Sequence, residues 1–213
     1  MSSAVAQPSP APPDDSRPLS PAQIALFETP HLANVERPQT LRYTYRQVGP
    51  DGFEDTIGLR VYAINSDGTK DLAFEYLTGP HRVGFPGVTH FRGNPLLMLV
   101  LERDVTGMHA AAGLSASYFR NRIREAFVDA ASVAETTAER DGRTVTAREI
   151  TVQPFAKEAR LAQAAGLQAK IYRFTLIDAV PGMIEQIRIE TPADPAGGGP
   201  ARSEQITFAG VEP

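Results

Sequence analysis

Two histidines in the segment 80–91 have the spacing that best suits metal binding. A tight turn centred on Phe85 and Pro86 would place His81 directly opposite His90 on paired strands. Opposed strand residues have Cβ atoms about 5 Å apart, so one divalent ion could bridge both imidazoles. The patterns H-E-x-x-H and H-x-H are absent, and a surface hairpin with two solvated histidines is the simpler interpretation. A metal-binding protein or metal-dependent enzyme that uses His81 and His90 is therefore an alternative function.

Charged side chains on two predicted helices could also bind a ligand. Glu102 and Asp104 flank Arg103; either carboxylate could supply a third metal ligand, and ion pairing or solvation on the helix is the simpler role. Arg120 and Arg124 are four residues apart and share one helix face. We interpret that face as solvated, with anionic lipid headgroups as the alternative partner.

Seven aromatic side chains form a further candidate site. Each falls on the apolar side of a predicted strand, because successive strand residues point to opposite faces of a sheet. If helices fill the inside of the sheet incompletely, these rings would line an apolar cavity suited to an acyl chain; if they fill it completely, the rings form an ordinary core. The predicted ligand-binding residues are Tyr43, Tyr45, Phe74, Tyr76, Tyr172, Phe174 and Phe208.

The sequence does not match the common catalytic motifs. With no cysteine, a thiol nucleophile, a disulfide framework, an iron–sulfur cluster and Cys-ligated zinc are all excluded. The sequence at 113–117, GLSAS, differs from the G-x-S-x-G nucleophile elbow, and the glycines at 197–199 precede no helix. We therefore predict a protein that is not an enzyme and needs no cofactor.

Composition limits the partners. The 213 residues are 42% hydrophobic, enough for one real core, and the net charge of −4 lacks the positive field of a nucleic-acid-binding protein. The longest apolar run, residues 96–101, is far shorter than the roughly 20 residues of a membrane-spanning helix. The expected partners are an apolar small molecule or lipid and a cell-envelope protein, with no nucleic acid and no membrane span.

The N-terminal segment differs in composition from the rest. Residues 1–20 are rich in proline and poor in large apolar side chains, so we predict a disordered tail followed by a single domain over 21–213. Ala4-Val5-Ala6 matches the cleavage pattern of signal peptides, although no basic and apolar stretch precedes it. Either Met1 lies inside a longer signal peptide, which indicates the periplasm, or the match is accidental and the protein is cytoplasmic.

The order of elements predicts an α+β fold. A short helix from Pro21 is followed by about four alternating strands, two helices near 96–108 and 115–130, and about five more strands. The turns at 65–68 and 141–142 carry Asp-Gly, which favours hairpins. We expect a strongly curved antiparallel sheet, a half-open barrel, with the helix pair on its concave side and a short N-terminal helix.

In element order, residues 21–210 resemble the half-open barrels of the LolA/LolB lipoprotein carriers and related lipid-binding envelope proteins. The resemblance rests on topology and compartment, with no diagnostic motif. It implies a non-enzymatic envelope protein that binds or carries a hydrophobic ligand, a lipid or lipoprotein acyl chain, between sheet and helices. A structural or interaction subunit with a filled core is another alternative.

Overall fold

The computed structural model describes residues 18–195 and 199–213. The Pro-rich segment 1–17, which includes Ala4-Val5-Ala6, lies outside the described residues, as do residues 196–198. The predictions made for the tail and for the cleavage motif are therefore not addressed by the structure.

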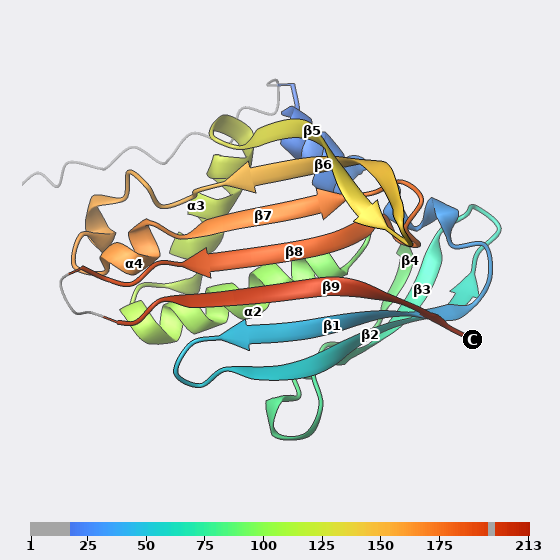
Figure 1. The fold of residues 1–213 in the computed structure, drawn as a ribbon, viewed down its shortest axis with the longest axis horizontal. Helices are drawn as coiled ribbons and strands as arrows, with labels where there is room; N and C mark the ends of the chain where they lie inside the picture. The colour runs from blue at the N-terminus through green and yellow to red at the C-terminus, as the bar shows by residue number, and fades with distance from the viewer. Residues whose placement is uncertain (1–17, 196–198) are drawn as a thin grey trace, which may run out of the picture.

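In the part of the chain that the structure describes, nine antiparallel strands form one open sheet in the order β4-β3-β2-β1-β9-β8-β7-β6-β5 (Figure 1). The first four strands and the last five are two meanders, joined where β1 pairs with β9. The strands are β1 Gln39–Val48, β2 Phe53–Ile64, β3 Lys70–Tyr76, β4 Val88–Phe91, β5 Ser132–Arg140, β6 Arg143–Val152, β7 Ile171–Leu176, β8 Ile184–Thr191 and β9 Arg202–Glu212. The predicted α+β class and the division into four and five strands are confirmed.

Local turn chemistry explains two of the hairpins. Gly68 has a φ of 81°, and the Asp67 carboxylate accepts hydrogen bonds from the backbone N–H and hydroxyl of Thr69. Asp141 and Gly142 both have positive φ, of 51° and 71°, as a tight hairpin turn requires. Both predicted Asp-Gly turns are therefore confirmed.

The helical segments are two long helices and several short turns. Ser20 caps α1 through a reciprocal capping box with Gln23, and the Ser115 side chain caps α3. The segments are α1 Pro21–Gln23, η1 Ile24–Glu28, η2 His31–Asn34, η3 Gly79–His81, α2 Leu96–Ala112, α3 Ala116–Asp129, η4 Ala159–Leu161 and α4 Ala165–Gln168. The two predicted long helices are thus present, and α2 extends four residues beyond 108.

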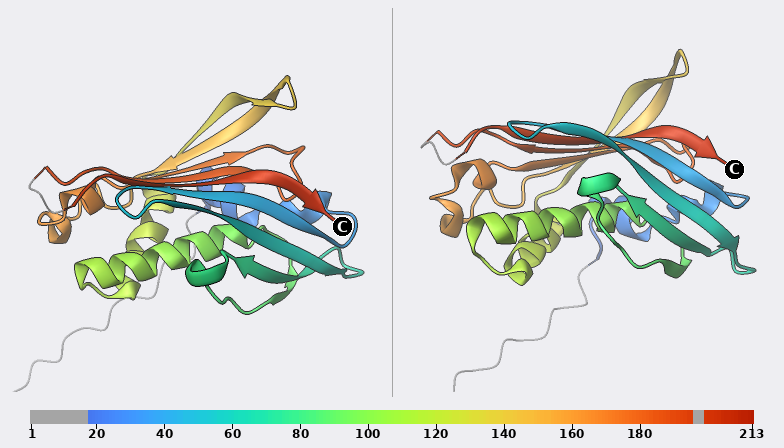
Figure 2. Two further views of the ribbon diagram at one scale, coloured as in Figure 1. Left: turned by 60° about the horizontal axis from the view of Figure 1, so that its bottom comes forward. Right: turned by 90° about the horizontal axis from the view of Figure 1, so that it is seen from below.

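The α2–α3 pair lies on one face of the sheet, which bends around it on the side of β2 and β3 (Figures 1 and 2). In the chain, this pair connects the two edge strands, β4 and β5. Inward-facing strand residues such as Leu59, Ile150 and Ile187 are fully buried in one cluster with Leu97 and Phe119 of the helices. The β5–β6 hairpin extends from the sheet away from the helices (Figure 2).

A buried polar junction holds the start of α2. The Asn94 side chain donates to the Tyr43 hydroxyl (3.2 Å) and to the Gly182 carbonyl (2.9 Å). The Asn94 backbone N–H donates to Nδ1 of the fully buried His31 (3.3 Å), whose Nε2 lies 2.8 Å from the Ala25 carbonyl. These hydrogen bonds therefore connect four segments that are distant in sequence, around residues 31, 43, 94 and 182.

The predicted hairpin between His81 and His90 does not form. Val83 pairs with Tyr76 and Val88 with Leu72, so both ends of the segment pair with the same strand, β3. Because Val83 and Val88 each bond β3, they do not face each other, and the register that would oppose the two imidazoles is wrong.

Candidate functional site

An apolar groove of about 530 Å³ lies between α2, α3 and the β3–β4 edge. Val105 of α2 and Phe127 of α3 form part of its floor, while Phe74 and Phe85 line it from β3 and from the connection to β4. Its volume is in the range of small-molecule sites, about 300–1,000 Å³. Met98 is 53% exposed at its edge, so apolar surface faces solvent here.

Helical periodicity explains which side chains reach the groove. On α3, Arg120, Ile123, Arg124 and Phe127 are spaced i, i+3, i+4 and i+7 and therefore share one face. Two of these side chains are apolar and buried, and the two arginines are exposed. The same face thus supplies both the floor of the groove and its charged rim.

The rim carries an ion pair between the two helices. Arg120 Nε donates to Glu102 Oε2 at 2.9 Å, and a second guanidinium nitrogen contacts the other carboxylate oxygen. This pair lowers the pKa of Glu102 below its ordinary value. Segment η1 also lines the groove, where the Phe27 and Phe127 rings meet edge to face at 5.2 Å.

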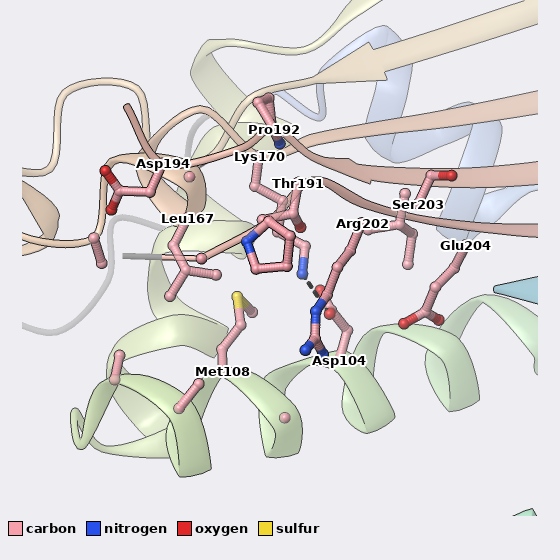
Figure 3. A pocket seen from close by; sticks show the side chains of 18 residues that line it. Asp104, Met108, Leu167, Lys170, Thr191, Pro192, Asp194, Arg202, Ser203 and Glu204 are labelled. Atoms are coloured by element: carbon pink, nitrogen blue, oxygen red, sulfur yellow. Dashed lines mark hydrogen bonds and ion pairs between the residues drawn. The ribbon is translucent and has the colours of Figure 1, made fainter. Parts of the chain in front are cut away.

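A second, polar pocket of about 390 Å³ lies on the sheet side of α2 (Figure 3). Lys170 Nζ bonds Asp104 Oδ1 at 2.5 Å, and the Tyr172 hydroxyl donates to Asp104 Oδ2 at 2.5 Å. All three residues are buried. Burial, reinforced by the nearby Asp104 carboxylate, raises the pKa of Tyr172 well above its ordinary value, so the hydroxyl remains a donor.

The other charged side chains of this pocket also have protein partners. Glu204 accepts from Arg103 at 2.6 Å, Arg202 lies 3.8 Å from Asp51, and Asp194 accepts from the Ala165 backbone N–H. Because Asp104, Lys170 and Glu204 are paired within the protein, we assign the pocket a structural role in joining α2 to the sheet.

The structure places six of the seven predicted ligand-binding aromatics in the packed core. The six rings are between 0% and 7% exposed and fill the space between sheet and helices: Tyr43, Tyr45, Tyr76, Tyr172, Phe174 and Phe208. Phe74 is partly buried and lines the apolar groove. The inward orientation predicted from strand alternation is therefore right, but the groove lies beside these rings and uses mainly helix and loop residues.

The two histidines of the predicted metal site lie in different surroundings. His81 stacks on Phe53 with ring centroids 3.7 Å apart, whereas the His90 backbone N–H donates to Asp71. Over residues 18–195 and 199–213, no three His, Cys, Asp or Glu side chains are grouped as a metal site requires. The structure therefore does not bring the proposed ligands together.

Sequence reasoning missed the Lys170–Asp104–Tyr172 cluster. Lys170 has the same strand parity as Tyr172, so alternation along β7 was the signal that it points inward. The groove itself had no comparable signal, because Phe85 and Pro86 belong to a connection without regular structure.

Comparisons with known proteins find similarity among solved structures only. No protein-family model matches the sequence. No curated protein sequence matches it either. Among solved structures, the lipoprotein LppX of Mycobacterium tuberculosis is similar over 91% of this chain and 97% of that chain, with a TM-score of 0.37 and 11% sequence identity. Because a similarity this distant carries no argument about function, the interpretation below rests on the geometry of the groove.

Within the described ranges, none of the helices combines the length and the apolar character needed to cross a membrane.

Proposed function

We propose that this protein binds a hydrophobic small molecule or lipid chain in the groove between α2, α3 and the β3–β4 edge, and that it does not catalyse a reaction on it. The observation that carries this proposal is the groove itself, an apolar hollow of about 530 Å³ with exposed Met98 at its edge. Transfer of an apolar ligand from water to such a surface is favourable by about 25 cal/mol per Å² buried.

Two further observations support a ligand over a purely structural role. The core rings beside the groove are already buried, so the groove is additional apolar surface at the edge of the core. In the polar pocket on the other side of α2, Asp104, Lys170 and Glu204 are paired within the protein, whereas the groove exposes apolar surface to solvent. Residence in the cell envelope and a carrier role remain predictions from the sequence.

The proposal is tested by titrating dodecanol into the purified protein and measuring heat. Met98→Glu should weaken binding at least about tenfold, because a carboxylate at the edge of the groove is costly to desolvate. The matched control is Val48→Glu, since Val48 is also apolar, 51% exposed and outside the groove lining. No binding by the wild type, or equal loss in both variants, would contradict the proposal.

A further inference from the structure

The rim of the apolar groove carries an excess of positive charge. Its charged side chains are Glu102, Arg120 and Arg124, so two guanidinium groups face one carboxylate. Arg120 and Glu102 neutralise each other through two contacts between their side chains. The remaining positive charge at the rim is that of Arg124.

Arg124 has no ion-pair partner in the part of the chain that the structure describes. The nearby acidic residue Glu125 is occupied by Arg122, at 2.7 Å. The neighbouring groove residues Ile123 and Phe127 are buried and apolar, so the guanidinium stands at the boundary between apolar surface and water. A charged side chain at such a boundary can bind the oppositely charged end of a ligand while the apolar part of that ligand is buried next to it.

We propose that the ligand of the groove is an amphiphile with one apolar chain and an anionic headgroup, and that Arg124 binds the headgroup. This inference rests on the proposed function and specifies the class of ligand. The planar guanidinium presents paired donors that match a carboxylate or a phosphate. The chain of the ligand lies along Val105 and Phe127, and the headgroup stays at the solvent edge beside Arg124.

The test compares three ligands of equal chain length at neutral pH: dodecanoate, dodecanol and dodecylammonium. The wild type should bind dodecanoate about three- to fivefold more tightly than dodecanol, as expected for one partly exposed ion pair. Arg124→Gln should bring this ratio to about one. Arg124→Glu should favour dodecylammonium instead.

Two further variants make the measurement specific. Arg143→Gln removes the same charge from the β5–β6 hairpin, which extends away from the helices, and should preserve the dodecanoate preference (Figure 2). Glu102→Gln removes the partner of Arg120 and should increase the preference, because a second guanidinium becomes available at the rim.

The outcomes separate this inference from the proposed function. Equal binding of dodecanoate and dodecanol by the wild type, or a preference that survives Arg124→Gln, overturns the headgroup assignment and leaves the groove as a neutral apolar site. No binding of any ligand overturns both. Sedimentation of the same samples identifies a protein occupant: a dimer that Met98→Glu dissociates would show that a second copy of the chain fills the groove and would also overturn both. Binding of acetate as tight as that of dodecanoate would show that the chain adds nothing to a simple anion site, and would overturn the amphiphile.

Discussion

The two sides of helix α2 differ in how they satisfy their polar groups. On the sheet side, Asp104 is buried and bonded to both Lys170 and Tyr172, and Arg103 is paired with Glu204. On the α3 side, Met98 is exposed beside an apolar groove whose rim includes a cation without a partner in the described chain. The first side uses its charges to hold the helix in place, and the second leaves surface available for a ligand.

This difference has a physical cause. A charge removed from water must be paired, so the sheet side can contain Asp104 and Lys170 only as a bonded set. Apolar surface at the edge of a core has no such requirement and remains exposed at a modest cost. Variants on the two sides should therefore affect different quantities, stability on the sheet side and ligand affinity on the groove side.

The largest effect is expected from Asp104→Ala. This change leaves the Lys170 ammonium buried without its partner, and breaking a buried pair from one side costs about 3–5 kcal/mol of unfolding free energy. Chemical denaturation measures it. The double variant Asp104→Leu with Lys170→Met removes both charges and should recover most of the loss; a single variant as stable as the wild type would contradict the structural role.

Tyr172→Phe should have a smaller effect on the same cluster. It removes the hydroxyl that donates to Asp104 Oδ2 and keeps the buried ring, so the loss is about 1.5 kcal/mol, as for a hydrogen bond to a charged group. Denaturation is again the measurement. Tyr62→Phe, on a side chain 48% exposed, is the control and should change nothing measurable.

His31 should make the unfolding free energy depend on pH. Its Nδ1 accepts a hydrogen bond from the Asn94 backbone N–H, just before α2 begins. Burial, with the charge of Arg148 acting in the same direction, lowers the pKa of His31 below its ordinary value of 6.5. The unfolded chain therefore takes up a proton that the folded protein excludes, and the unfolding free energy falls as the pH decreases below 6.5. Protonation of Nδ1 would also remove the acceptor of the Asn94 N–H.

The pH dependence is checked by measuring unfolding free energy at several pH values from 7.5 downward. His31→Gln should flatten the slope below pH 6.5, whereas His109→Gln, at an exposed histidine of α2, should retain it. An identical slope in wild type and His31→Gln would show that other groups cause the acid sensitivity.

The smallest change in stability is expected from Met98→Gln on the groove side. Because Met98 is 53% exposed, its replacement should alter the unfolding free energy by less than about 0.5 kcal/mol. A loss near that of Asp104→Ala would mean that the groove is part of the stabilising core and would remove the contrast between the two sides.

The sequence predicted more of the fold than of the site. Strand alternation placed Tyr43, Tyr172 and Phe174 on the inner face correctly, because that orientation follows from a two-residue period. The assumed hairpin at Phe85 and Pro86 was wrong, because both ends of that segment pair with β3 instead of with each other. A turn signal within residues 81–90 cannot reveal that another strand, here β3, takes the backbone hydrogen bonds that the hairpin would need.

By itself, the sequence determined the helices, most strands, the Asp-Gly turns and the inward side of each strand, since these depend on neighbours within a few residues. Only the tertiary structure decided which apolar surface stays exposed. The fold joined Asp104 to Lys170, 66 residues away, and left Arg124 beside the groove with no ion-pair partner among residues 18–195 and 199–213. These pairings depend on how helices and sheet pack, and packing brings together groups whose separation along the chain carries no local signal.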